Sequence, residues 1–383
     1  MSPPVSAGRL ALKLITTAAQ ITFLQDVNIL PVIGACHHCG STITTAYKEK
    51  KNERFWQCGA CHHTTSIRHD TVLYQSNLPL NRFVMLAYCF TQRNKTYSQV
   101  INECCLPNEA YVDNSMSGDT VNRWFTYFRH LCCKDWLESV SKIGGKGSIV
   151  EIDESMFGKL KYGRGDGRVR RKAWVFGMVC RETSKCVLWL CPRDKEGKFR
   201  RTKPALWPII QAFVKPETMI YSDGFRGYRK LPNLGYEHKW VDHSKEYVNS
   251  EGVHTNQMEG LWGVVKRWLP SSGPYNLQEY LQLFQWFHMM KQHEEDPFWR
   301  LMDLISENNS KDILKEAKDN QKKPDLNGEA EDAFLEDIDE DEEEEDDNHL
   351  TDDEEQYWYD CVICKMIFES DKARNNHMLS CNK

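Results

Sequence analysis

The sequence predicts an α/β fold, a mixed sheet with flanking helices, over residues 146–306 of this 383-residue chain. Short β-branched or apolar runs predict strands at SIVEIDES, TMIYSD and HKWVDHS. AWVFGMVCRE and KCVLWLCP predict a hairpin that turns at Thr183–Ser184. LWPIIQAFVKP predicts a helix, and HTNQMEGLWGVVKRWL predicts another, which begins at Thr255 or Asn256 and carries one apolar stripe. Hydrophobic residues make up 40% of the chain, which is enough to bury a core.

A helical lead-in is predicted over residues 1–30, and a metal-binding pattern follows over residues 31–75. Cys36 and Cys39 form one C-x₂-C pair, and Cys58 and Cys61 form a second pair after 18 intervening residues. Two such pairs are typical of a zinc ribbon, in which four thiolates hold a structural zinc ion. Basic residues between the pairs leave two interpretations open, a zinc-stabilised folding module or a DNA contact.

Residues 76–140 predict a small module of short helices. Its third segment, DTVNRWFTYFRHLCC, resembles the last helix of a helix-turn-helix. In that interpretation Asn122, Arg123 and Arg129 are candidate DNA contacts. The alternative is an ordinary solvated helix face.

Three acidic residues stand at positions where the predicted elements end or meet. Asp153 and Asp223 each follow a strand-like run, and Glu259 borders the apolar stripe of the last helix. Three carboxylates from separate elements can hold two Mg²⁺ or Mn²⁺ ions about 3.5–4 Å apart, an arrangement that promotes phosphodiester displacement. Taken singly, an acid at a strand end is more often a solvated surface group or a cap.

The segments VEIDES, YSDGFRGY and HTNQMEGLWGVVKRWL resemble the three catalytic blocks of the Merlin superfamily of DNA transposons and its bacterial insertion-sequence relatives. The resemblance implies a ribonuclease H-like DDE transposase domain, in which Asp153, Asp223 and Glu259 are catalytic and bind the two Mg²⁺ or Mn²⁺ ions. It also implies cleavage at transposon ends, strand transfer into target DNA, and at least a dimer on DNA. Two rival interpretations remain, a domesticated DNA-binding regulator without catalysis and a zinc-dependent adaptor.

Basic side chains follow the first predicted strand in the glycine-punctuated run KLKYGRGDGRVRRK. A run of this kind suits a phosphate-binding loop, and the alternative is a solvated charge run. The candidate DNA-binding residues are Arg123, Arg164, Arg168, Arg170, Arg171, Lys172, Lys266 and Arg267.

An acidic linker and a second zinc pattern complete the chain. Residues 307–356 are predicted to be disordered, and residues 329–355 contain 18 acidic residues and no Lys or Arg. Removing those 18 negative charges changes the net charge from −6 to +12, which suits a polyanion partner. Residues 357–383 predict a zinc finger with the ligands Cys361, Cys364, His377 and Cys381.

The finger and the acidic linker are candidate contacts for a protein partner. The appended finger also favours a eukaryotic host, and we therefore expect a nuclear protein. No apolar run reaches the roughly 18 residues that a membrane span needs, so a membrane is not an expected partner.

Overall fold

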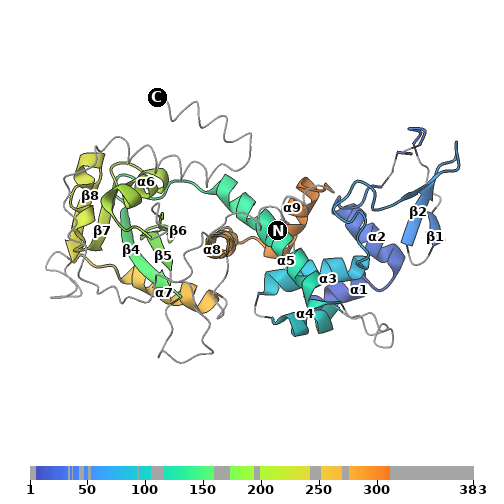
Figure 1. Cartoon of the computed structure of the whole chain (residues 1–383), viewed down its shortest axis with the longest axis horizontal. Helices are drawn as coiled ribbons and strands as arrows, with labels where there is room; N and C mark the ends of the chain where they lie inside the picture. The colour runs from blue at the N-terminus through green and yellow to red at the C-terminus, as the bar shows by residue number, and fades with distance from the viewer. Residues whose placement is uncertain are drawn as a thin grey trace, which may run out of the picture. The chain divides into compact units, whose positions relative to one another are not determined.

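The computed structural model describes residues 6–32, 35–36, 38–42, 47–50, 53–93, 95–104, 116–158, 173–193, 199–241, 252–269 and 276–310. These residues fall into two compact units, one that ends at Asp135 and resumes at Met290, and one from Trp136 to Met289. Helices α5 (Gly118–Ser139) and α8 (Leu277–Gln292) cross the boundaries between the units. Figure 1 labels the elements.

The first unit contains a small antiparallel sheet, in the order β1-β2-β3, and several helices. Two helices form the lead-in, and each is capped by a hydroxyl oxygen: that of Ser6 accepts from the amide of Arg9, and that of Thr16 accepts from the amide of Ala19. Besides α5, the elements are α1 (Ala7–Lys13), α2 (Thr17–Asp26), β1 (Tyr47–Lys50), β2 (Glu53–Gln57), β3 (Thr64–Ser66), α3 (Leu80–Gln92), α4 (Tyr97–Cys104) and α9 (Pro297–Glu307).

Aromatic side chains form the core of the helical part of this unit. The ring centroids of Phe83 in α3 and Trp124 in α5 lie 4.9 Å apart, edge to face, as aromatic pairs prefer. Phe298 of α9 packs on Tyr88 of α3 in the same way, at 6.1 Å. Phe298 thus packs α9 on the aromatic surface of α3.

The second unit is built on a five-stranded mixed sheet in the order β6-β5-β4-β7-β8. The first three strands form an antiparallel meander, β7 runs parallel to β4, and β8 runs parallel to β7. The strands are β4 (Ile149–Phe157), β5 (Ala173–Cys180), β6 (Cys186–Leu190), β7 (Met219–Asp223) and β8 (Glu237–Val241). This mixed sheet fits the predicted ribonuclease H-like arrangement. A strand is present at each position predicted for this region, and the last three residues of HKWVDHS lie outside the described residues.

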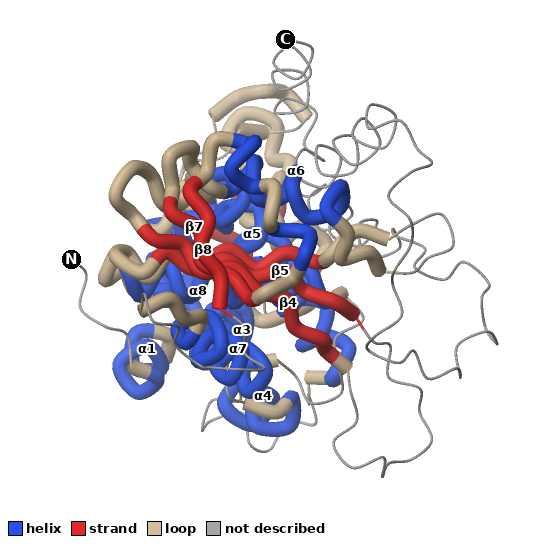
Figure 2. Tube along the Cα trace, turned by 90° about the vertical axis from the view of Figure 1, so that its left-hand side faces the viewer, coloured by secondary structure: helices blue, strands red, loops and turns tan. Residues whose placement is uncertain are grey.

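Helices cover both faces of this sheet. Figure 2 shows α6 (Lys203–Phe213) on one side of the red strands and α7 (Asn256–Trp268) on the other. Met258, Trp262 and Val265 of α7 belong to one apolar cluster with residues of β5, β6 and α8. Side chains alternate between the two faces along each strand. The odd-numbered residues of β4, β5 and β7 therefore point toward α7, as do the even-numbered residues of β6.

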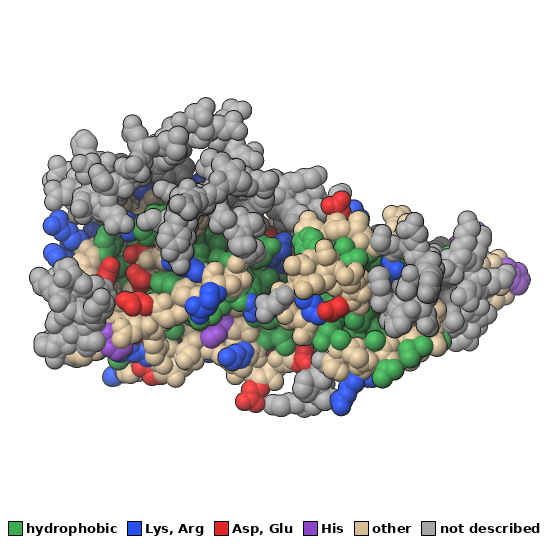
Figure 3. All heavy atoms as spheres, turned by 90° about the horizontal axis from the view of Figure 1, so that it is seen from below, with side chains coloured by type: hydrophobic (Ala, Val, Ile, Leu, Met, Phe, Trp, Pro, Cys, Tyr) green, Lys and Arg blue, Asp and Glu red, His purple; other side chains and the backbone are tan. Residues whose placement is uncertain are grey.

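Among the residues that the structure describes, no helix is both long enough and apolar enough to cross a membrane. On the face shown in Figure 3, the described Lys and Arg side chains (blue) are interspersed with Asp and Glu side chains (red). The basic side chains that are described thus do not form one continuous patch on that face.

Candidate active site and zinc centre

Asp153 and Asp223 lie side by side because of the register between two parallel strands. β4 and β7 pair residues that are 70 apart in the sequence, beginning with Ile149 and Met219. The same offset places Asp153 next to Asp223, the last residue of β7. Both side chains point toward α7, and their carboxylate oxygens lie within 4.8 Å of each other and of a carboxylate oxygen of Glu154. The structure therefore brings two of the three predicted acids together.

Glu154 is a third carboxylate that the sequence analysis did not single out. It follows Asp153 on β4, and because β7 ends at Asp223, it lies just beyond the end of the neighbouring strand. The hydroxyl of Tyr228 donates a hydrogen bond to its carboxylate. Burial raises the pKa of Glu154 well above its ordinary value, and the charges of Asp223 and Asp153 raise it further. The adjacent acid in the run IDES was the available signal for this residue.

The electrostatics of the cluster favour a bound cation. Burial raises the pKa of Asp153 to about 6, and the charge of Asp223 adds to the shift, while a hydrogen bond from Trp262 opposes it. Carboxylates this close cannot all ionise without a compensating charge. Oxygen donors of this kind suit hard ions such as Mg²⁺ and Mn²⁺. The donor set therefore fits a divalent metal ion.

Glu259 lies near this cluster without joining it. It is in the first turn of α7, and its side chain is exposed. Its carboxylate is not among the three acidic groups that lie within 4.8 Å of one another. Its charge nevertheless contributes to the raised pKa of Asp153. Glu259 is thus at the rim of the acidic cluster, three residues before Trp262.

Trp262 contacts the cluster directly. Its indole Nε1 donates a hydrogen bond of 2.8 Å to Oδ2 of Asp153. Trp262 is also buried, as a residue that packs on the sheet would be. The structure adds a polar contact to this packing role.

A buried carboxylate caps the start of α7. Thr255 is the N-cap residue, but its side chain makes no capping hydrogen bond. Glu151 of β4 takes this place, because its Oε2 accepts from the backbone amide of Met258 at 3.0 Å. Glu151 is 0% exposed, and it lies two residues before Asp153 on the same face of the sheet. The strand that carries Asp153 therefore also fixes the helix that carries Glu259.

Arg181 neutralises this buried acid. Its Nε donates to Oε1 of Glu151 at 2.6 Å, and its guanidinium lies 4.7 Å from the ring centroid of Tyr221. Its Nη2 donates to the carbonyl oxygen of His254 at 2.7 Å. His254 therefore contacts both members of the ion pair beneath α7, because its Nδ1 also lies 3.7 Å from Oε1 of Glu151.

The two cysteine pairs of the first unit form matching knuckles. The amide of Cys36 donates to the carbonyl of Ser41, and the amide of Gly40 donates to the carbonyl of Cys36. The knuckle that begins at Cys58 repeats both hydrogen bonds at the same offsets. The fifth residue of each knuckle has a positive φ, 70° at Gly40 and 57° at His62. Both knuckles therefore turn their thiols in the same way.

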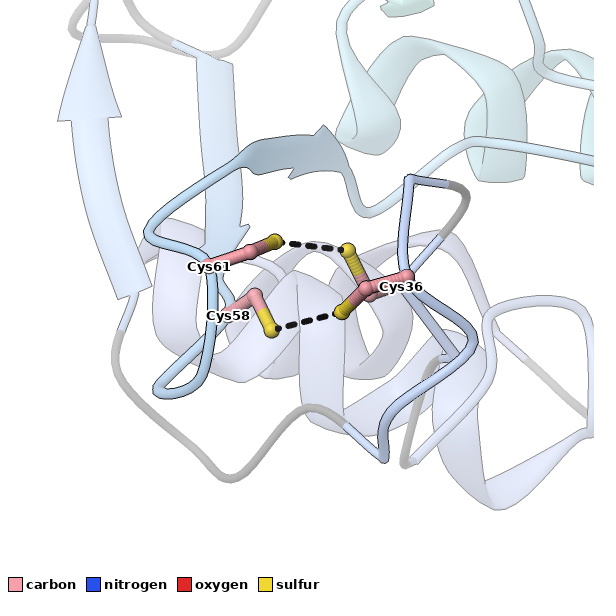
Figure 4. Close-up of side chains that lie close together, drawn as sticks. Cys36, Cys58 and Cys61 are labelled. Carbon is pink, nitrogen blue, oxygen red and sulfur yellow. Dashed lines mark hydrogen bonds between the residues drawn. The ribbon is translucent and has the colours of Figure 1, made fainter.

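The four thiols of these knuckles converge, as Figure 4 shows. Sγ of Cys36 lies 3.5 Å from that of Cys61, and Sγ of Cys39 lies 3.6 Å from that of Cys58. A tetrahedral zinc ion with Zn–S distances of about 2.3 Å requires sulfurs about 3.8 Å apart. The spacing of the thiols therefore fits a structural zinc ion.

The candidate DNA-binding residues within the described part of the chain differ in accessibility. Arg123, Lys266 and Arg267 are exposed. The ammonium of Lys266 lies 5.4 Å from the ring centroid of Phe157, where partial burial lowers its pKa and the nearby Asp153 acts in the opposite direction. Arg129 is 8% exposed, so its proposed role as a DNA contact is not supported.

Asn122, the other candidate contact in this helical module, is engaged within the unit. Its side-chain oxygen accepts a hydrogen bond of 3.0 Å from the hydroxyl of Tyr97 in α4. This contact joins α4 to α5, and Asn122 is exposed, which is compatible with the solvated helix face as well as with a DNA contact.

Several predicted site residues lie outside the described residues. They are Arg164, Arg168, Arg170, Arg171 and Lys172 of the basic run, and Cys361, Cys364, His377 and Cys381 of the predicted finger.

Comparison with known proteins supports a DDE transposase family for this chain. Residues 144–289 match the family of ISXO2-like transposase domains, and this segment contains Asp153, Asp223 and Glu259. An uncharacterized transposase-like protein of Haemophilus influenzae is 33% identical over 64 residues, which are 17% of this chain and 51% of that protein. The chain thus spans about half the length of this relative. Neither similarity distinguishes the Merlin superfamily from other DDE transposases.

Proposed function

We propose that this protein is a DNA transposase of Merlin type that cleaves transposon ends and joins them to target DNA with the help of divalent metal ions. The observation that carries the proposal is that the carboxylates of Asp153 and Asp223 lie within 4.8 Å of each other on two neighbouring parallel strands. The similarity of residues 144–289 to transposase domains supports the same chemistry.

Asp153 and Asp223 are the proposed metal ligands, and Glu259 is the proposed third acid. Mg²⁺ or Mn²⁺, two per site, would activate the attacking oxygen and stabilise the leaving oxygen. Glu259 lies close enough to influence Asp153, and its exposure leaves its side chain free to turn toward the cluster when metal and DNA bind.

Two displacements at phosphorus make up the proposed reaction. Water attacks the phosphodiester at the transposon end, the bond from phosphorus to the 3′ oxygen breaks, and that oxygen leaves as a 3′-hydroxyl. This hydroxyl then attacks a phosphodiester of the target, and a 3′ oxygen of the target strand leaves. Neither step needs an oxidant or a high-energy cofactor.

DNA binding is proposed for residues around the active site and in the first unit. Lys266 and Arg267 lie in the last turn of α7, where their exposed charges can meet backbone phosphates. Arg123 and the zinc ribbon would contact the transposon ends, and the basic run after β4 would contact DNA near Asp153. A dimer or larger assembly on DNA, and action in the nucleus, complete the proposal.

A strand-cleavage assay with the full chain tests this function. The substrate is a duplex that carries the genomic DNA from both sides of the coding region, where a transposon has its terminal inverted repeats, and the assay compares Mg²⁺, Mn²⁺ and EDTA. We expect metal-dependent nicking and strand transfer, lost in Asp153→Asn and in Asp223→Asn. Glu237→Gln is the control, because it removes one negative charge at an exposed position of β8 in the same sheet.

The domesticated alternative predicts a different result in the same assay. The wild-type chain would bind the duplex in EDTA as well as in Mg²⁺, and it would leave every phosphodiester intact. If zinc-loaded and folded protein gives that outcome, the proposed enzyme function is wrong and the protein is a DNA-binding regulator.

A further inference from the structure

We propose that Trp262 is a positioning residue that orients the carboxylate of Asp153 for metal binding, and that Gly177 makes this possible by leaving room for the indole. The inference rests on the proposed metal site. It concerns how the site is held, and it involves one residue from α7 and one from β5.

The first observation is the hydrogen bond itself. Trp262 Nε1 donates to Oδ2 of Asp153 at 2.8 Å, which occupies one oxygen and fixes the rotation of the carboxylate. An indole has one N–H and no acceptor, so it can hold one carboxylate oxygen without competing for a cation. The second oxygen of Asp153 is not bonded to the indole, and a carboxylate oxygen of Asp153 lies within 4.8 Å of carboxylate oxygens of Asp223 and Glu154.

The second observation is how firmly the indole is held. Trp262 is 6% exposed, and its ring lies edge to face with Phe157, at a centroid distance of 5.8 Å. Val175 and Val265 belong to the same buried cluster. A donor held by packing on several sides keeps its direction, which is what a ligand-orienting group requires.

The third observation is the glycine directly across from Asp153. Gly177 on β5 pairs with Asp153 in the antiparallel register of β4 and β5, so it lies beneath the same part of α7. A Cβ built on Gly177 would lie 2.6 Å from both Cη2 and Cζ2 of Trp262, and 2.3 Å from Cε of Met258. The methionine end can move aside, but the indole cannot move without changing its contact with Asp153. The indole of Trp262 therefore packs directly on the backbone of Gly177, where a larger residue would displace it.

The position of Trp262 also connects two acids. Glu259 precedes it by three residues, so both lie on one side of α7, and Glu151 holds the start of that helix on β4. The distance between Glu259 and Asp153 is therefore set by the same helix that orients Asp153.

Mn²⁺ binding to the full, zinc-loaded chain tests the proposal, with electron paramagnetic resonance of free Mn²⁺ as the readout. Asp223→Asn defines the background, which includes weak binding to the acidic residues 329–355 and is common to all variants. Trp262→Phe keeps a ring and removes the donor. Trp268→Phe is the matched control, because Trp268 lies in the same helix and packs on the same cluster.

We expect Trp262→Phe to raise the dissociation constant of the Asp223-dependent Mn²⁺ site about 10- to 100-fold, the usual effect of losing a group that orients a metal ligand. Trp268→Phe should bind Mn²⁺ as the wild type does. A role in packing alone would lower the unfolding temperature of Trp262→Phe and leave its Mn²⁺ affinity within twofold of wild type, and that result overturns the proposal. Equal Mn²⁺ binding by wild type and Asp223→Asn would contradict the proposed metal site, on which this inference rests.

Gly177→Ala gives an independent second arm. In the wild-type background it should weaken Mn²⁺ binding, because the added Cβ displaces the indole. In the Trp262→Phe background it should add little, because the shorter ring lacks the two atoms that the Cβ would meet. Residues that act through one contact show such non-additive effects. Additive losses in the double variant contradict the proposed link between Gly177 and Trp262.

Discussion

The ion pair beneath α7 gives a prediction that can be worked out in some detail. Glu151→Gln preserves the shape of the side chain and removes its charge. Arg181, whose side chain is 17% exposed, then loses the negative charge that its Nε meets at 2.6 Å, and because glutamine has only one acceptor oxygen, one of the two hydrogen bonds that Glu151 accepts is lost. Breaking a buried ion pair by removing one partner costs about 3–5 kcal/mol. We expect the low end, about 3 kcal/mol, because Arg181 retains some contact with solvent.

The effect should appear in the second unit and most strongly in α7. A loss of about 3 kcal/mol lowers the unfolding temperature of a domain of this size by about 6–12 °C. Since the chain has two compact units, a local readout is needed as well. Hydrogen–deuterium exchange of peptides that span residues 256–268 should be faster in the variant, because Glu151 caps that helix through the amide of Met258.

Glu237→Gln is the matched control, since it removes one negative charge from an exposed position on the same sheet. It should leave both the unfolding temperature and the exchange of α7 close to wild type. If Glu151→Gln behaves like this control, with a midpoint within 1 °C of wild type and unchanged exchange in α7, the ion pair does not anchor the helix.

Three further predictions concern pH, zinc and DNA. Burial lowers the pKa of His238 to about 4, below its value in the unfolded chain. The unfolded chain therefore binds a proton first as the pH falls, and stability that is complete above pH 6.5 is lost between pH 6.5 and 4. In His238→Asn the unfolding temperature should depend less on pH over that window. Cys58→Ser should reduce the zinc content by one ion per chain, measured by elemental analysis, and should destabilise the ribbon, measured by limited proteolysis. Unchanged zinc content would contradict the assigned ligand set. The logarithm of the DNA association constant should fall with the logarithm of the salt concentration less steeply in Lys266→Ala and in Arg267→Ala, by about 0.9 in the slope for each variant. An unchanged slope would mean that the residue contacts no phosphate.

Much of the fold of the second unit followed from local sequence patterns. The strands around Asp153 and Asp223 are short, apolar and bounded by turn residues, and the apolar stripe of α7 has a helical period. Such patterns indicate which side chains are buried, and therefore which face of a helix or strand packs against the core. The helix at Asn256 and the strand that ends at Asp223 were therefore both predictable.

The contacts within the site were less predictable, because they depend on pairing between distant segments. Nothing local to VEIDES indicates that Glu151 caps a helix more than 100 residues later, or that Gly177 lies opposite Asp153. These contacts follow from the register of β4 with β5 and from the position of α7 on the sheet. Glu154 was overlooked for a related reason, since its role depends on where β7 ends.

The packing of the last helices could not be derived from their own pattern either. α8 and α9 both carry apolar faces, and an apolar face does not specify its partner. α8 covers the sheet, whereas Phe298 of α9 meets Tyr88, because the aromatic surface of α3 is the complementary one. Similarly, Arg129 was predicted from charge and spacing to contact DNA, and tertiary packing buries it.

Metal-directed cleavage of the polypeptide tests the central claim most directly. Fe²⁺ bound in place of Mg²⁺, with ascorbate and peroxide, cuts the backbone near its ligands and needs no DNA substrate. The account predicts cuts close to Asp153 and Asp223, suppressed by excess Mg²⁺ and absent in Asp223→Asn, with a further cut near Glu259 if that acid joins the site. Cuts confined to the acidic residues 329–355, with none at the ends of β4 and β7, would contradict it.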